Sequence, residues 1–137
     1  MKQVLRNKDK GSVLVRYKKS FFQAIDGFIY ALKYEHNMII IVTCAILAVF
    51  AGLTFRISLT EWLFLILVIG LVMGSEMINT AIEATIDLKT LETHPLAKIA
   101  KDSASTATLI FSIVSFIGAL LMFVPKLIDC MNSIQLI

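Results

Sequence analysis

WLFLILVIGLVMGSEMINTAIEATIDL, residues 62–88, is an apolar segment that changes character part-way along. Its uncharged part, Trp62 to Ser75, would extend only roughly 21 Å as a helix, which is too short for a bilayer core of ~30 Å. To cross a membrane, the helix must continue through its polar half. Four polar side chains of that half fall on one helical face: Glu76, Asn79, Glu83 and Asp87. Because carboxylates are costly to place in a membrane, this set indicates a functional site.

Apolar segments dominate the rest of the chain. Of its 137 residues, 58% are hydrophobic, which is typical of a small integral membrane protein and leaves no room for a soluble kinase fold. Residues 37–55 and 103–125 carry no charge and are long enough to span the bilayer. Proline suits a first helical turn, so the last helix is expected to begin at Pro95. We predict a single all-α membrane domain, 1–137, with three transmembrane helices over 37–55, 62–88 and 95–125.

Basic residues are concentrated before the first membrane helix. They are Lys2, Arg6, Lys8, Lys10, Arg16, Lys18, Lys19 and Lys33, whereas the connection to the second helix holds only Arg56. Since basic residues favour the cytoplasmic side, we expect the N-terminus and the loop between Asp87 and Asp102 to be cytoplasmic. The polar face then opens toward the compartment that contains ATP. The net charge of +3 suits the anionic inner leaflet better than nucleic acid.

The region before the first membrane helix divides into two parts. Residues 1–11 are polar and are expected to form a mobile tail, whereas 12–36 carry an apolar stripe typical of a helix that lies on the membrane surface. The stripe consists of Phe21, Ile25, Phe28 and Leu32. Glu35 returns to the apolar side if this helix persists. Alternatively, the helix ends near Tyr34 and Glu35 caps or solvates a turn; periodicity leaves both possibilities open.

The polar residues permit metal-assisted chemistry on a phosphate. Mg²⁺ prefers oxygen ligands, typically one or two carboxylates with phosphate oxygens and water, and Glu35 and Glu83 could supply them. Lys101 can meet a phosphate as a point charge, and Asp102 could orient that lysine or contact a nucleotide. Glu76 lies about two turns deeper than Glu83, at the depth of a lipid hydroxyl, and is a candidate general base. The chain has no GxxxxGK[ST], HRD or DFG pattern, so a kinase activity requires another scaffold.

Other interpretations of these residues stay open. The carboxylates of the second helix could simply pair with Lys98 and Lys101, as in a non-catalytic membrane subunit. An intramembrane Glu76 would also suit a small transporter. His94 is expected to be solvated, because no second His or Cys stands at metal-ligand spacing from it.

Two further patterns concern packing between helices. Gly70 and Gly74 form a small-xxx-small pair that lets another helix approach closely. On the third helix, five polar residues share a phase: Lys101, Ser105, Thr108, Ser112 and Ser115. Hydroxyls in membrane helices usually bond to backbone or to a neighbouring helix, so we expect only the cytoplasmic end of this polar seam to be functional.

Two blocks of the sequence resemble the signature of the bacterial integral-membrane diacylglycerol kinases. The first is EMINTAIE, from Glu76 to Glu83, followed by Asp87, and the second is Ala100-Lys101-Asp102. Glu35-His36-Asn37 and the loop residues 94–98 (HPLAK) extend the resemblance over nearly the whole chain from Arg16 onward. With these, the chain is more similar to the undecaprenol kinase branch than to the branch that prefers diacylglycerol.

This resemblance implies a homotrimer in the bacterial plasma membrane, with each site formed where subunits meet. It implies transfer of the ATP γ-phosphate to a lipid alcohol, with undecaprenol the first hypothesis and diacylglycerol the alternative. Glu76 would be the general base, Glu35 and Glu83 the ligands of Mg²⁺, and Asn79 a positioning group near the phosphates. The implied contacts with the nucleotide are Arg16, Asp87, Glu92, Thr93, His94, Lys101 and Asp102. Arg16 and Ser105 match family positions near lipid or nucleotide.

Overall fold

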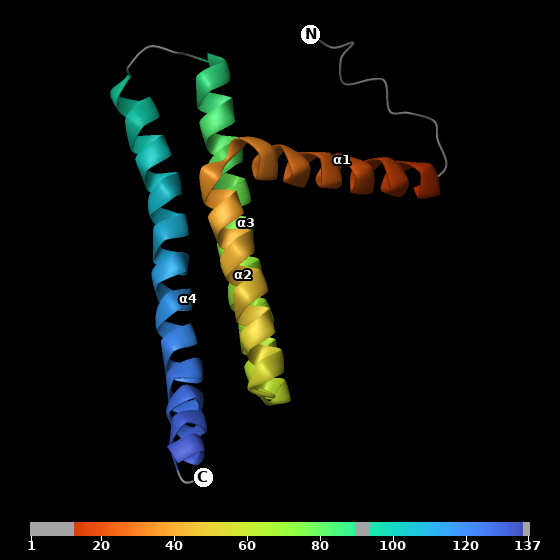
Figure 1. The fold of residues 1–137 in the computed structure, drawn as a ribbon. Helices are drawn as coiled ribbons and strands as arrows, with labels where there is room; N and C mark the ends of the chain where they lie inside the picture. The colour runs from red at the N-terminus through yellow and green to blue at the C-terminus, as the bar shows by residue number, and fades with distance from the viewer. Residues whose placement is uncertain (1–12, 90–93, 136–137) are drawn as a thin grey trace.

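The computed structural model describes residues 13–89 and 94–135, which form four α-helices (Figure 1). They are α1 (Val13–Tyr34), α2 (His36–Thr54), α3 (Leu59–Lys89) and α4 (Pro95–Gln135). The last three are each long and apolar enough to cross a membrane. The described part of the chain is therefore all-helical with three candidate membrane spans. The tail expected over 1–11 lies outside the described residues.

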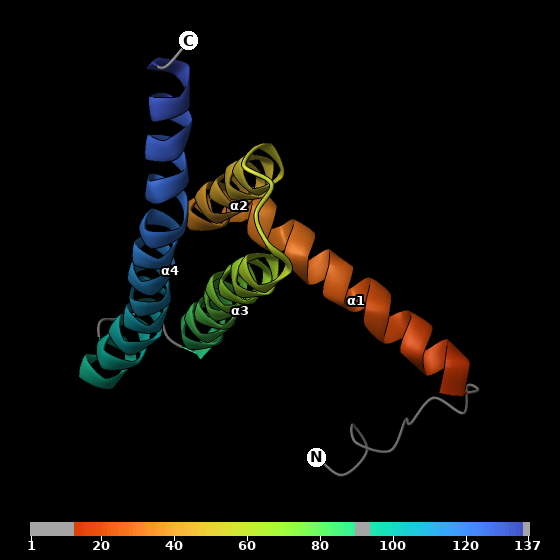
Figure 2. The same cartoon turned by 90° about the horizontal axis from the view of Figure 1, so that it is seen from below.

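The first helix stands apart from the other three. Figures 1 and 2 show α1 leaving the bundle at a steep angle, and of its own residues only Ala31, close to its end, is buried. At Glu35 the backbone is extended, with φ −104° and ψ 113°. The helix therefore ends at Tyr34, and Glu35 lies in the turn before α2, without a capping hydrogen bond from its side chain. Of the two possibilities left open by the sequence, the structure has the turn.

The turn between α2 and α3 is closely hydrogen-bonded. The Arg56 amide donates to the Leu53 carbonyl at 3.3 Å, and the Ile57 amide donates to the Gly52 carbonyl at 3.1 Å. These two bonds form a Schellman motif, which requires a left-handed residue after the helix. Arg56 takes that conformation, with φ 49°, in place of the usual glycine.

α3 begins at Leu59, three residues earlier than expected, because Ser58 and Glu61 cap it. The Ser58 amide donates to Glu61 Oε2 at 2.7 Å, and the Glu61 amide donates to Ser58 Oγ at 3.3 Å. This reciprocal arrangement is a capping box, which satisfies amides that the first helical turn leaves free. The helix then packs against each of the other three, most extensively against α4.

The packed core lies at the end of the bundle near this turn. Its buried side chains are Ile57, Leu65 and Val68, and partly buried aromatic residues pack around them. Gly52 allows the close approach of α2 and α3, because a Cβ there would lie 3.0 Å from both Ile57 Cδ1 and the Trp62 ring. A larger residue at position 52 would therefore push the two helices apart.

The last helix is longer than its membrane segment requires. α4 has 41 residues and so measures about 61 Å, roughly twice the ~30 Å of a bilayer core. It continues through Pro125, where we expected the membrane helix to end. Proline removes one amide donor, a loss that membrane helices tolerate when neighbouring groups compensate. Directly after it, Lys126 Nζ lies 2.9 Å from Glu61 Oε1 and ties α4 to the start of α3.

Candidate active site

Glu76 is the most deeply buried acidic side chain of the described residues. It is 1% exposed, and neither carboxyl oxygen has a hydrogen-bond partner among the described residues. Asn37, at the start of α2, and Thr108 of α4 are the polar side chains that face it from the neighbouring helices. The helices α2, α3 and α4 thus each contribute one polar residue to a single layer, which consists of Asn37, Glu76 and Thr108. Buried polar atoms without partners are rare in native proteins, so this layer is a candidate binding site.

More polar groups continue along the same face of α3. Asn79 and Thr80 follow Glu76 by three and four residues, and both are buried. Asn79 Nδ2 donates to Glu83 Oε1 at 3.2 Å. Asn79 Oδ1, Thr80 Oγ1 and Thr108 Oγ1 find no partner within the described residues. The helical repeat therefore aligns Asn79 and Thr80 with Glu76 in a row of buried polar side chains along α3.

Near the end of the row, an ion pair joins α3 to α4. Lys101 Nζ lies 2.5 Å from Asp87 Oδ1, and both side chains are partly exposed. Because α3 and α4 are antiparallel, the end of one and the start of the other meet there. Asp87 lies about 16 Å beyond Glu76 along α3, so the polar face extends from a buried carboxyl to an exposed ammonium.

The carboxyls of Glu35 and Glu83 both lie close enough to Glu76 to act electrostatically on its charge. Glu35 belongs to the turn between α1 and α2, where the backbone is extended. Within residues 13–89 and 94–135, no group of three or more His, Cys, Asp or Glu side chains is arranged to hold a metal ion by itself. A divalent cation would therefore depend on two protein carboxylates and on oxygen atoms of a phosphate, which is the usual situation for Mg²⁺.

Several residues expected from the sequence lie outside this cluster. His94 Nδ1 accepts a hydrogen bond from the Leu96 amide at 3.2 Å and so caps the start of α4. Asp102 and Ser105 are exposed on α4. Arg16 is exposed in the first turn of α1, about 28 Å along the helix from Glu35. Glu92 and Thr93, expected to contact the nucleotide, lie outside the described residues.

Three polar side chains near Glu76 were not among the predicted site residues: Asn37, Thr80 and Thr108. Thr108 belongs to the polar seam of the last helix, but we expected only the cytoplasmic end of that seam to be functional. Asn37 follows Glu35 closely in sequence, and Thr80 follows Asn79. For Asn37 and Thr80, the sequence signal was their closeness in the chain to predicted site residues. Periodicity within one helix does not show which residue of another helix faces it.

Taken together, the described residues form a helical bundle with three candidate membrane spans, one buried carboxyl, and further acidic groups and a basic group at the same end. These features suit a small helical membrane enzyme. Comparison with known proteins identifies the family to which the chain belongs. Residues 22–123 match the family model for prokaryotic diacylglycerol kinase. The chain is 40% identical to an undecaprenol kinase of Bacillus subtilis over 121 residues, covering 88% of this chain and 98% of the relative.

Diacylglycerol kinases are also among its relatives. The chain is 37% identical over 99 residues to one from Helicobacter pylori, covering 69% of this chain and 74% of the relative. It is 34% identical over 84 residues to one from Pseudomonas aeruginosa, covering 61% of this chain and 68% of the relative. The protein belongs to the prokaryotic diacylglycerol kinase family and is a multi-pass membrane lipid kinase that uses ATP. The resemblance read from the two sequence blocks is thereby confirmed.

Proposed function

We propose that this protein phosphorylates undecaprenol and forms undecaprenyl phosphate. The observation that carries the proposal is the buried carboxyl of Glu76, inside a chain that aligns with nearly the full length of an undecaprenol kinase. Phosphorylation of diacylglycerol is the second candidate, because other relatives are named diacylglycerol kinases. Both lipids present a primary hydroxyl at the membrane surface, so the acidic residues alone do not distinguish them.

Glu76 is the proposed general base. The lipid hydroxyl would lie against its carboxylate, and the hydroxyl oxygen would attack the γ-phosphorus of ATP. The bond from that phosphorus to the β,γ-bridging oxygen breaks, ADP leaves with the electron pair, and the proton of the hydroxyl passes to Glu76. Because the Glu76 side chain is only 1% exposed, little water can reach it, and water would otherwise compete as the acceptor of the phosphate.

Glu35 and Glu83 are the proposed protein ligands for Mg²⁺. Their carboxyls flank Glu76 from two elements, and the Asn79 oxygen beside them has no partner among the described residues. This donor set fits a hard cation that completes its shell with phosphate oxygens and water. When bound, such a cation neutralises charge on the transferred phosphate. Asn79, held by Glu83, would position the phosphates.

The nucleotide is proposed to lie along the polar face of α3. The distance from Glu76 to Asp87, about 16 Å, leaves room for an extended triphosphate between them. Lys101 would exchange its contact with Asp87 for one with a phosphate, as a mobile point charge can. The proposed further contacts are Arg16, Asp87, Glu92, Thr93, His94 and Asp102, with Arg16 and Ser105 near the lipid.

A homotrimer with cytoplasmic sites is part of the proposal. Arg16 is too far along α1 to join the cluster of its own chain, so a neighbouring copy would have to supply it. A Cβ at Gly70 or Gly74 would have no heavy atom within 4 Å among the described residues, which leaves this small-residue face of α3 open to another helix. Gly74→Leu is therefore expected to weaken the oligomer while leaving the helices intact, as measured by light scattering and circular dichroism in detergent. An unchanged oligomeric mass would exclude this face as the interface.

The test of the proposed reaction is transfer of labelled γ-phosphate by the purified full chain. Undecaprenol and diacylglycerol are supplied in matched mixed micelles, with Mg²⁺ and with chelator. We expect Mg²⁺-dependent transfer with a higher kcat/KM for undecaprenol. A clear preference for diacylglycerol would reverse the order of the two candidates. Absence of transfer to either lipid by folded protein would turn the assignment toward a non-catalytic subunit or a transporter.

A further inference from the structure

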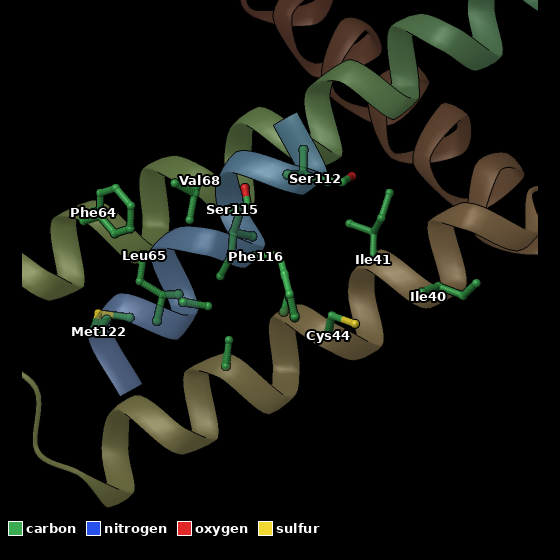
Figure 3. Close-up of a pocket in the computed structure, with 15 residues that line it drawn as sticks. Ile40, Ile41, Cys44, Phe64, Leu65, Val68, Ser112, Ser115, Phe116 and Met122 are labelled. Atoms are coloured by element: carbon green, nitrogen blue, oxygen red, sulfur yellow. The ribbon is translucent and has the colours of Figure 1, made fainter. Parts of the chain in front are cut away.

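An apolar cavity of about 370 Å³ lies between α2, α3 and α4 (Figure 3). Each of the three helices contributes five of its lining residues. Almost all are aliphatic or aromatic; Ser112, Ser115 and Cys44 are the exceptions. Figure 3 shows Met122, Leu65 and Phe64 at one end of the cavity and Ile40, Ile41 and Ser112 toward the other.

The cavity begins one helical turn from the candidate active site. On α3, Val72 precedes Glu76 by four residues; on α2, Ile41 follows Asn37 by four; on α4, Ser112 follows Thr108 by four. Because four residues make about one turn, the polar layer and the cavity are stacked along all three helices at once. The surroundings thus change from polar to apolar within one turn, in the order that a lipid alcohol presents its hydroxyl and its chain.

The far end of the cavity is closed by close packing. The Phe64 ring lies directly over Gly118, where a Cβ would be only 2.7 Å from Phe64 Cζ. Leu65 is 3% exposed and belongs to the core, against which Met122 packs. Small side chains stand just before this closure, among them Ala48 of α2 and Ala119 of α4. The depth of the cavity is therefore set by a few named residues.

We propose that this cavity holds the part of the hydrocarbon chain next to the reacting hydroxyl, and that Ala48, Ala119 and Phe64 determine which lipid alcohols are accepted. This inference rests on the proposed lipid kinase function. A chain that bears methyl branches, as a polyprenol does, needs more width beside Ala119 than a straight acyl chain. Small residues at positions 48 and 119 would then favour the branched lipid.

The test fills the cavity and measures discrimination between lipids. Ala119→Phe places a ring in the cavity, and Ile117→Phe adds bulk on the exposed side of the same helix as a matched control. We expect Ala119→Phe to lower kcat/KM for undecaprenol by roughly tenfold or more relative to diacylglycerol, with the KM for ATP unchanged. Ile117→Phe should leave the ratio unchanged. Equal ratios in the two variants would overturn the inference.

A second variant tests the same cavity in case Ala119→Phe does not fold. Ala48→Leu fills the same cavity from α2 and is expected to shift the preference in the same direction. Circular dichroism and a monodisperse elution profile establish that each variant is folded. A folded Ala48→Leu that treats the two lipids as the unsubstituted chain does would count against the cavity.

A readout that needs no catalysis uses the thiol of Cys44. Cys44 and Cys130 are both free, so Cys130→Ser leaves one reporter in the cavity wall. We expect undecaprenol, without ATP, to slow alkylation of Cys44 by an apolar maleimide severalfold in vesicles, and Ala119→Phe to abolish that protection. Equal protection by vesicle phospholipid alone would overturn the inference. Failure of phosphate transfer with protection intact would instead contradict the proposed kinase reaction and leave the cavity as a lipid site.

Discussion

The start and the middle of α3 each carry a carboxylate, but only the one at the start, Glu61, has hydrogen-bond and ion-pair partners among the described residues. At the start of the helix, Glu61 accepts from the Ser58 amide and pairs with Lys126, and the core residues Ile57, Leu65 and Val68 lie close by. Further along, Glu76 is buried with no hydrogen-bond partner among the described residues. One helix thus has a start that stabilises the fold and, further along, a buried carboxyl without a partner among the described residues.

Within the single helix α3, the residues that stabilise the fold are therefore separate from the residues of the candidate active site. Satisfied caps and close packing lower the free energy of the folded chain. Buried polar atoms without partners raise it, and they persist where binding or chemistry gives them a role. Substitutions in the two regions should therefore change different measurements: phosphate transfer near Glu76, and resistance to unfolding near Ser58.

The largest effect is expected from Glu76→Gln. The amide keeps the shape of the side chain but cannot accept the hydroxyl proton, so transfer to the lipid should fall by about 100-fold or more. Thermal unfolding in detergent should occur at the same temperature or slightly higher, because the amide has the same size and places no charge in the buried site. Near-normal turnover in folded protein would remove Glu76 from the role of base.

Lys101→Ala is expected to act next most strongly. Losing a charged contact to phosphate should raise the KM for ATP roughly tenfold or more. Its ion pair with Asp87 is partly exposed, so stability should change by less than about 1 kcal/mol. Lys98→Ala, an exposed lysine one turn away, is the matched control in the same kinetic assay. Equal changes in KM for the two variants would argue against a specific contact.

Gly52→Ala, a change in α2, probes the packing against the start of α3. The new Cβ would approach both Ile57 and Trp62 too closely, so we expect a loss of about 1–3 kcal/mol of stability, with kcat/KM per folded molecule unchanged. Gly27→Ala is the control, because a Cβ there meets only Met77 Cε, at 4.0 Å. Thermal scans of both variants in one detergent make the comparison. A loss of activity without a loss of stability would show that the two regions are not independent.

The smallest effect is a gain, from Arg56→Gly. Arg56 has φ 49°, a conformation that costs most residues about 1–2 kcal/mol and glycine almost nothing. Part of this gain is offset because glycine is more flexible in the unfolded chain, so stability should rise by up to about 1 kcal/mol. Arg56→Ala removes the charge but keeps the backbone cost, and its unfolding temperature should not rise. If Arg56→Ala stabilised as much as Arg56→Gly, charge would be the cause.

How much of this was predictable depends on the range of the interaction. The face that carries Glu76, Asn79 and Glu83 follows from the helical repeat, so it could be derived from spacing alone. The capping box at Ser58 and Glu61 is also local, yet the apolar run alone predicts a start at Trp62, because the two capping residues precede that run. The continuation of α4 through Pro125 could not be derived locally, because tertiary packing decides whether a helix tolerates the lost amide.

The sequence by itself determined that this protein is helical, that three apolar segments can cross a membrane, and that a polar face on one of them resembles a lipid kinase signature. These properties depend on composition and on periodicity, which each segment carries independently of the others. Only the tertiary structure decided that Asn37, Glu76 and Thr108 form one layer, that Glu35 turns toward it, and that an apolar cavity begins one turn below. Such contacts depend on the register between helices, which is set by how side chains from distant segments pack together.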